Sequence, residues 1–269
     1  LQKIDSKWYY FNASGVMQTG WQKLSGKWYY FNASGVMQTG WQKLSGKWYY
    51  FNASGVMQTG WQKVDGSWYY FNICGKYGLQ VQNLLKKASA LDIKMILPLH
   101  GPVLRENLSY YVNLYSTWSS YAPESEGIFV AYASIHGGTK AVAEKFAEIL
   151  KEKGAVKVSL CDLTRDDQAE AVEDAFRYPV TVIAACSYDA GLFPPAHSFI
   201  HHLQDKGWQK RKVGLIENGS WAPSAGRVMK EMLSTLKSVE IVEPMVTIKS
   251  RMKESDIPAL EALADALLT

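Results

Sequence analysis

The fold of most of this chain is decided by residues 128–154, which read IFVAYASIHGGTKAVAEKFAEILKEKG. The first six residues form a continuous apolar run, as is typical of a strand buried on both faces of a sheet. A short loop at 134–139 follows, and residues 139–153 then repeat apolar side chains at helical spacing until Gly154. A buried strand, a glycine loop and an amphipathic helix in this order predict one unit of a parallel α/β sheet.

The same alternation continues to the end of the chain. We expect further strands at 156–160, 180–185 and 212–216, and a last strand shared by 239–242 and 246–248. Helices are expected between and after them, at 166–176, 195–206, 224–236 and 255–268. Residues 127–269 are therefore predicted to form a doubly wound, five-stranded parallel sheet, which places ligands at the carboxyl ends of its strands.

Three loops at those strand ends form a candidate ligand site. The first contains Ser134, Ile135, His136, Gly137, Gly138 and Thr139. Its hydroxyls, its paired glycines and the helix that follows suit an anion without any Lys or Arg in the loop. The second contains Ser187, Tyr188, Asp189 and Gly191, and the third contains Asn218, Gly219, Ser220 and Trp221. A phosphate loop with two aromatic residues from other strand ends predicts a site for FMN, although a glycine turn before a helix is common and each ring alone could be a packing residue.

The three loops, and IENGSWAP at 216–223 in particular, resemble the flavodoxin-like domain of flavodiiron proteins. The resemblance extends from about Tyr77 to the end of the chain and implies a flavodoxin-like fold, bound FMN, a redox partner protein and a cytoplasmic location. We expect electron transfer by the flavin, with no catalytic acid or base and with Asp189, His197, His201 and His202 at the surface. The family usually has Asn where Gly138 stands and often Thr where Ser187 stands, so this chain is expected to make fewer flavin contacts.

Residues 73–126 precede this domain. A helix is expected at 80–91 and a short strand at 93–97. The segment LPLHGPVLR at 97–105 resembles the end of the metallo-β-lactamase-like domain of flavodiiron proteins, where the matching His100 is the last ligand of a two-iron site. No His precedes His100, and one imidazole cannot hold a diiron centre, so we expect an orphan ligand, no metal and no diiron catalysis.

The first 72 residues are a repeat with a period of 20. Residues 11–30 recur without change at 31–50, and a third copy begins at Phe51. Aromatic WYYF strands separated by glycine turns predict β-hairpins, and because one hairpin cannot bury its own face, the copies should stack into a solenoid.

Tryptophans recur within these repeats seven residues apart. The pairs are Trp21 with Trp28, Trp41 with Trp48, and Trp61 with Trp68. Stacked hairpins would bring each pair beside an aromatic residue of the next repeat, and we expect a cage without a nearby Lys that attracts a quaternary ammonium group. The alternative is that these rings only fill the solenoid core.

The motifs GWQK, GKWYYFN and GVMQTGW resemble the choline-binding repeats of pneumococcal-type cell-wall proteins. That resemblance implies choline on a cell-wall polymer as the ligand and a cell-surface location, although some homologous repeats bind carbohydrate. Because Leu1 lies inside a repeat, we expect further sequence upstream.

Composition separates the two parts of the chain. Residues 1–72 hold seven Lys and two Asp, whereas the remainder holds 22 basic and 23 acidic residues. The three cysteines, Cys74, Cys161 and Cys186, form no CxxC pair and are expected to be thiols. No apolar run has the length of a membrane span. No nucleic-acid partner is expected.

The leading hypothesis is an FMN-binding electron carrier of a truncated flavodiiron type, fused to choline-binding repeats. The alternatives are a cell-wall-binding module that carries a passenger domain, and an artificial fusion.

Overall fold

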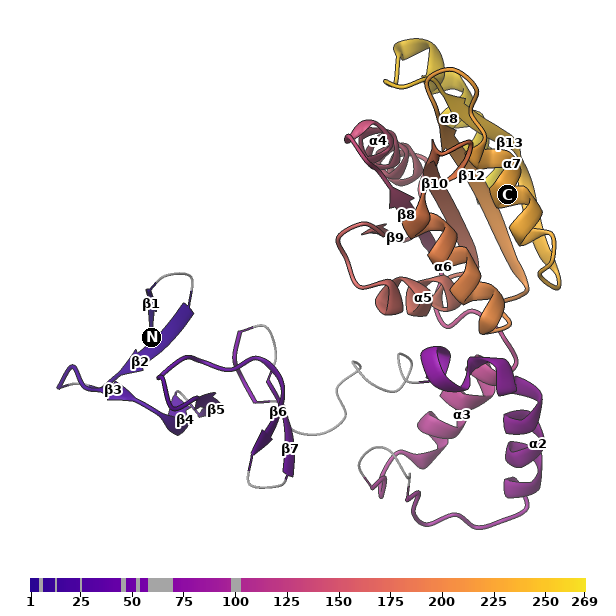
Figure 1. The fold of residues 1–269 in the computed structure, drawn as a ribbon. Helices are drawn as coiled ribbons and strands as arrows, with labels where there is room; N and C mark the ends of the chain where they lie inside the picture. Colours follow the sequence, from indigo (N-terminus) through magenta and orange to yellow (C-terminus); the bar gives the residue numbers. More distant parts are fainter. Residues whose placement is uncertain are drawn as a thin grey trace. The chain divides into compact units, whose positions relative to one another are not determined.

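A computed structural model describes most of the chain, namely residues 1–4, 7–12, 14–24, 26–44, 47–51, 54–57, 70–97 and 103–269, without the side chains at 41, 43 and 47–50. The chain divides into two compact units, Leu1–Lys63 and Val64–Thr269 (Figure 1). Within the described ranges, no helix is long and apolar enough to cross a membrane.

The first unit consists of antiparallel hairpins, as its repeat predicts. The strands pair as β1 (Gln2–Ile4) with β2 (Lys7–Phe11), β4 (Gly20–Leu24) with β5 (Lys27–Phe31), and β6 (Gly40–Leu44) with β7 (Lys47–Phe51). A short strand, β3 (Met17–Gln18), adds to β2, and single bridges join Phe31 to Met37 and Phe51 to Met57 in the later copies. The same pairing recurs because the same sequence recurs.

Consecutive hairpins contact one another. The amide of Met37 donates to the carbonyl oxygen of Trp8 at 2.8 Å, and the amide of Met57 donates to that of Trp28 at 2.6 Å. Phe31 is completely buried, as is Phe51 in the next copy. These contacts show that the hairpins stack, and the burial of one ring per repeat supplies the apolar contact that a lone hairpin lacks.

The second unit contains the parallel sheet. Its strands are β8 (Ile128–Ala133), β9 (Val158–Asp162), β10 (Val180–Tyr188), β12 (Arg211–Asn218) and β13 (Val239–Ile248), in the spatial order β13-β12-β10-β8-β9. All four pairings are parallel, and a short strand β11 (Gly191–Leu192) folds back antiparallel onto β10. The predicted flavodoxin-like, doubly wound sheet is confirmed.

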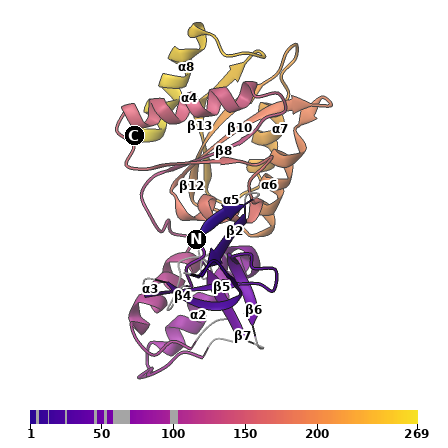
Figure 2. The same cartoon turned by 90° about the vertical axis from the view of Figure 1, so that its left-hand side faces the viewer.

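Helices cover both faces of this sheet (Figure 2). One face carries α4 (Gly138–Glu152) and α8 (Ile257–Leu268), the latter preceded by the short helix η3 (Glu254–Asp256). The other face carries α5 (Gln168–Arg177), α6 (Pro194–Asp205) and α7 (Ala225–Leu233). Phe146 is fully buried on the first side and Phe199 on the second, so the sheet is apolar on both faces.

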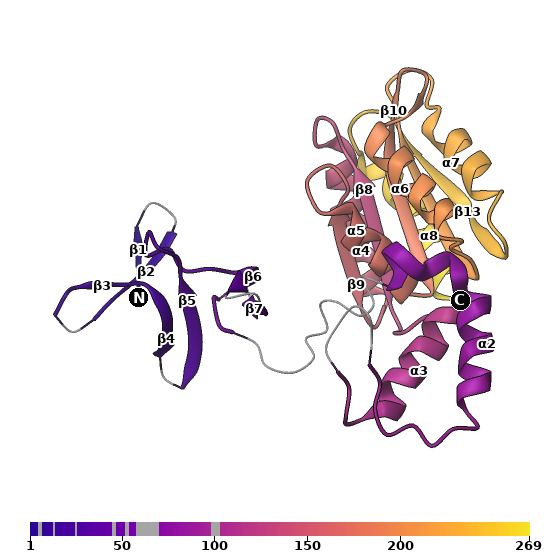
Figure 3. The same cartoon turned by 60° about the horizontal axis from the view of Figure 1, so that its bottom comes forward.

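A helical pair precedes the sheet in the same unit. Helix α2 (Gly78–Ala88) packs beside α3 (Leu108–Ser119), as Figure 3 shows. The strand expected at 93–97 is wrong, because only one bridge, between Ile96 and Leu104, forms there. An apolar run becomes a strand only when a neighbouring strand pairs with it.

The boundary between the two units, after Lys63, precedes the end of the repeat pattern at Asn72. Short helical segments η1 (Tyr70–Cys74) and η2 (Gly75–Tyr77) belong to the second unit. The ring of Phe71 stacks on that of Phe176 with centroids 4.4 Å apart, and Asn72 Nδ2 donates to the carbonyl oxygen of Ala169 at 3.1 Å. The limits 1–72, 73–126 and 127–269 describe sequence resemblance and stay a prediction.

Candidate functional site

The strand order brings the three predicted loops to one edge of the sheet. Strands β8, β10 and β12 are neighbours and run parallel, so their carboxyl ends lie side by side. The loops that leave these ends carry the residues singled out from the sequence. The sheet therefore gathers all three loops, as open α/β sheets do at a ligand site.

The first loop ends in an open helix terminus. Gly137 adopts φ of +85° at the N-cap of α4, and its amide donates to Ser134 Oγ at 3.0 Å. The first-turn amides of Gly138, Thr139 and Lys140 have no acceptor within the described ranges. Ser134 and Thr139 are buried, whereas Ile135 and His136 are exposed. Free amides at the positive end of a 15-residue helix can bind an anion.

The second loop is organised around Ser187. Its Oγ accepts from the amide of Ser224 at 2.8 Å and from that of Ala225 at 3.2 Å, at the start of α7. The hydroxyl therefore anchors the third loop, a role that the sequence did not reveal. Tyr188 is 45% exposed with its ring 5.8 Å from that of Phe193, and Asp189 is exposed.

The third loop is fixed by two buried polar residues. Glu217 accepts from the amide of Gly226 and from the hydroxyl of Thr247, both at 2.8 Å. Asn218 exchanges two hydrogen bonds of 2.9 Å with the backbone of Ser250. These contacts hold the backbone after β12, and the ring of Trp221 beyond them is 94% exposed.

Sequence reasoning missed a fourth loop, the one after β13. A Cβ atom at Gly138 would lie 2.7 Å from the carbonyl oxygen of Ser250, so this position must be glycine while the loop stays where it is. An Asn at this position would collide with that oxygen. In the sequence, Gly138 was the one sign that another segment approaches this position closely. The loop also carries the exposed cations Lys249 and Arg251, which the first loop lacks.

The thiol nearest the first loop is neutral at pH 7. Burial raises the pKa of Cys186, and hydrogen bonds from the Ile135 backbone and the Thr139 side chain offset this only in part. A protonated, partly buried thiol is a poor nucleophile. His197, His201 and His202 are exposed on α6, as expected, and Asp189 is likewise at the surface. The geometry at this edge therefore suits binding, and the Cys186 thiol stays protonated beside it.

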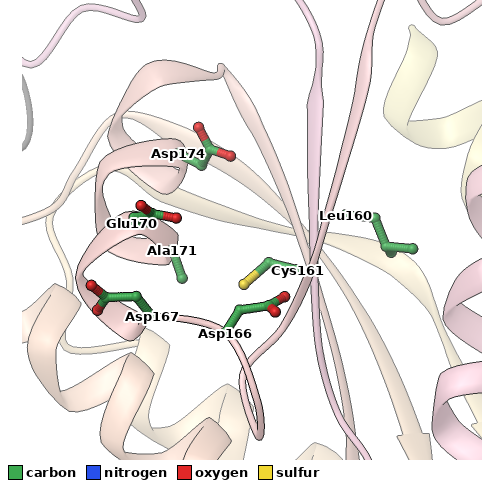
Figure 4. Close-up of a pocket in the computed structure, with 7 residues that line it drawn as sticks. All are labelled: Leu160, Cys161, Asp166, Asp167, Glu170, Ala171 and Asp174. Carbon is green, nitrogen blue, oxygen red and sulfur yellow. The ribbon is translucent and has the colours of Figure 1, made fainter. Parts of the chain in front are cut away.

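A separate pocket of about 220 Å³ lies between β9 and α5 (Figure 4). Its polar lining consists of Cys161 and of four carboxylates, from Asp166, Asp167, Glu170 and Asp174, while the Leu160 side chain points away. Burial, with the neighbouring carboxylates, raises the pKa of Cys161 to about 12. Asp166 accepts from the Asp162 amide, and Asp174 binds Arg177 and Ser159. Structural hydrogen bonds therefore engage Asp166 and Asp174 of this pocket.

No metal cluster is present where the structure describes side chains: no group of three or more His, Cys, Asp or Glu is arranged to hold an ion. His100 lies outside the described residues, so its predicted status as an orphan ligand stays a prediction.

The first unit contains an aromatic cluster on the β4–β5 hairpin. The rings of Trp21 and Trp28 are 6.2 Å apart at 88°, and the Trp21 ring lies 5.4 Å from that of Tyr30 and 5.6 Å from that of Phe51. Phe51 ends β7 in the following hairpin, so the cluster joins two consecutive hairpins, as the cage hypothesis requires. Trp21 and Trp28 remain 36% and 40% exposed, which leaves ring surface open.

One feature of the predicted cage is wrong. The sequence suggested no Lys nearby, but Lys23 Nζ lies 5.7 Å from the centroid of the Trp28 ring. The reason is the hairpin register, which places Lys23 directly opposite Trp28. The side chains of Trp41 and Trp48, and all of Trp61 and Trp68, lie outside the described residues.

Comparison with known proteins also distinguishes two parts of the chain. Residues 1–39 and 38–73 match the family model of the choline-binding repeat. The anaerobic nitric oxide reductase flavorubredoxin of an Enterobacter species is 24% identical over 172 residues, which cover 64% of this chain and 34% of that protein.

Solved structures share the fold. The flavodiiron protein from Giardia intestinalis has a TM-score of 0.67 at 19% identity, over 74% of this chain and 50% of that one. Rubredoxin oxygen:oxidoreductase from Desulfovibrio gigas has a TM-score of 0.71 at 15% identity, over 94% of this chain and 67% of that one. The chain spans about a third of the length of the Enterobacter relative and half that of the Giardia protein.

The chain thus combines choline-binding repeats with a unit whose flavodoxin-like fold and sequence are similar to those of flavodiiron proteins, a combination consistent with a chimera.

Proposed function

We propose that the second unit binds FMN at the edge where β8, β10 and β12 end, and that it serves as an electron carrier. The observation that carries this proposal is the coincidence of open helix amides at Gly138 and Thr139 with two exposed rings, Tyr188 and Trp221. Large rings left in solvent beside an anion site suit a flat, phosphorylated ligand. The similar flavorubredoxin and flavodiiron protein support the choice of a flavin.

The residues of this chain would divide the work. The first turn of α4 and the Ser134 hydroxyl would hold the phosphate, while Tyr188 and Trp221 would lie along the ring and exclude water. Asn218 and Ser187 would hold the loops in place through the hydrogen bonds described above. FMN, when bound, would supply reversible electron transfer, and the surrounding rings and amides would set its potential. Diiron catalysis is not part of the proposal.

The test is a titration of FMN with the purified chain, followed by quenching of flavin fluorescence. We expect about one FMN per chain. Thr139→Ala should weaken binding by roughly 1–3 kcal/mol, because it removes a hydroxyl beside a charged group. Trp221→Ala should weaken binding and change the bound-flavin spectrum.

Tyr110→Ala is the matched control, since Tyr110 is an exposed ring on α3, a helix that precedes the sheet and carries none of the three loops. Excess protein that leaves FMN fluorescence unchanged would end the proposal. Equal effects of Trp221→Ala and Tyr110→Ala would remove Trp221 from the site.

We also propose that the first unit binds choline. The cluster of Trp21, Trp28 and Tyr30, with Phe51 from the next hairpin, offers the ring faces that a quaternary ammonium group prefers. The match to the choline-binding repeat supports choline over carbohydrate. Choline binding and flavin binding are independent functions. They are compatible with an electron carrier that the repeats attach to the cell wall, and with a wall-binding module whose α/β unit has no role in binding the wall.

Choline should raise the melting temperature of the first unit at millimolar concentrations, because it binds only the folded form. Replacing Trp21 and Trp28 by Leu keeps apolar packing but deletes the π faces, so the response should fall while the other repeats still respond. Sodium chloride at equal ionic strength is the control. If the rings are only core, choline changes nothing and the variant is merely less stable.

A further inference from the structure

A lysine faces a tryptophan in the same way in successive hairpins. In β1–β2, Lys3 is paired with Trp8, and its Nζ lies 6.0 Å from the ring centroid. In β4–β5, Lys23 is paired with Trp28 at 5.7 Å. The β6–β7 hairpin has the same register, with Lys43 opposite Trp48. The contact therefore recurs in both hairpins whose lysine and tryptophan side chains the structure describes.

The lysine shares its hairpin face with the aromatic cluster. Side chains alternate between the two faces of a strand, so Trp21, Lys23, Trp28 and Tyr30 lie on one face. Lys27, which pairs with Leu24 across the turn, lies on the other face. Only one of the two lysines of the hairpin can therefore reach the open tryptophan surface.

We propose that Lys3, Lys23 and their equivalents are internal competitors that occupy the tryptophan face on which a quaternary ammonium ligand must stack. The inference rests on the proposed choline binding. Two cations cannot share one ring face without repulsion, so the lysine must swing away before the ligand binds. An ammonium group is strongly hydrated and gains little at an exposed ring, and a quaternary group loses less hydration there. The lysine thus lowers the affinity for choline without blocking the site. Cations that bind the ring more weakly than the lysine does cannot displace it.

The test is a choline titration of the full chain, followed by tryptophan fluorescence. Replacing Lys3, Lys23 and Lys43 together by Met keeps the apolar stems and removes the competing charges. Choline should then bind about twofold to fivefold more tightly, the equivalent of one exposed cation–π contact. Replacing Lys7, Lys27 and Lys47 by Met is the matched control, because it removes the same charge from the opposite face and should leave the affinity unchanged.

A second measurement reports the contact directly. In the free protein, the ε-methylene protons of Lys3 and Lys23 should be shifted upfield by the indole rings, and choline should reverse these shifts. Unchanged or weaker choline binding in the Lys3, Lys23 and Lys43 variant would overturn the competition while choline binding itself stood. If neither the protein nor any variant responds to choline, the proposed choline function fails, and the competition with it.

Discussion

The sequence Tyr-Phe-Asn occurs four times, and the copies at residues 30–32 and 70–72 have different structures. In the copy at 30–32, Phe31 ends strand β5 and its ring lies 6.1 Å from that of Tyr10 on β2 of the preceding hairpin. In the copy at 70–72, Phe71 lies in the helical segment η1 and stacks on Phe176 of the α/β unit. Both phenylalanines are almost completely buried.

The asparagines differ in the same way. Asn32 Oδ1 accepts from the amides of Ser34 and Val36, both at 3.0 Å, and closes the turn of its own repeat. Asn72 instead donates to the carbonyl oxygen of Ala169 on α5. The comparison teaches that burial of the phenylalanine is preserved and the backbone conformation is not. The backbone adopts whichever form the neighbouring surface can satisfy.

The largest effect should come from the phenylalanines themselves. Phe71→Ala should lower the stability of the second unit by about 3–5 kcal/mol, because it opens a cavity against Phe176. Phe31→Ala should destabilise the first unit alone. Urea unfolding followed by helical circular dichroism separates them, since every α-helix of the described ranges lies in the second unit. If Phe71→Ala lost no more stability than Tyr110→Ala, the packing of segment η1 on the α/β unit would contribute little to stability.

Alkaline pH should weaken the second unit selectively. Burial raises the pKa of Tyr70 and, with nearby carboxylates, raises those of Cys161 and Tyr132 to about 12. Each group stays protonated in the folded chain but ionises near its ordinary pKa once unfolded, so the unfolded state loses protons first as pH rises. Stability is therefore full below about pH 9 and falls towards pH 12, on the order of 1 kcal/mol per pH unit for each group.

Thermal melts between pH 8 and pH 11 would measure this slope. In Cys161→Ala, stability should fall less steeply as pH rises, because one ionising group is removed. Its stability at pH 7 should change by a different amount from its stability at pH 11. An identical slope in this variant would show that the Cys161 thiol is not protected from ionisation by folding.

The smallest effect should come from the asparagines. Asn72→Ala should cost the second unit about 1 kcal/mol, the typical net value of a partly buried hydrogen bond. Asn32→Ala should cost a similar amount in the first unit, where two backbone amides lose their acceptor. Chemical unfolding of each variant checks the assignment. If Asn72→Ala destabilised the first unit instead, the copy at 70–72 would act as a repeat after all.

Much of the α/β unit was predictable because its signals are local. Continuous apolar runs predicted the five strands, and helical spacing predicted the helices. The ends were less accurate: β10 continues to Tyr188, beyond the expected residue 185, because β11 folds back and pairs with it. The strand expected at 93–97 failed for the opposite reason, since no full strand pairs with it.

The sequence by itself thus determined the repeat, the order of strands and helices, and the residues of three loops at the strand ends. Tertiary structure alone decided that Ser250 closes against Gly138, that Lys23 covers Trp28, and that Phe71 joins the α/β core. Periodicity depends on neighbours a few residues apart, so it can be read along the chain. These three contacts depend on strand order, on hairpin register and on the surface that a ring finds to bury itself, which are set only when distant segments pack together.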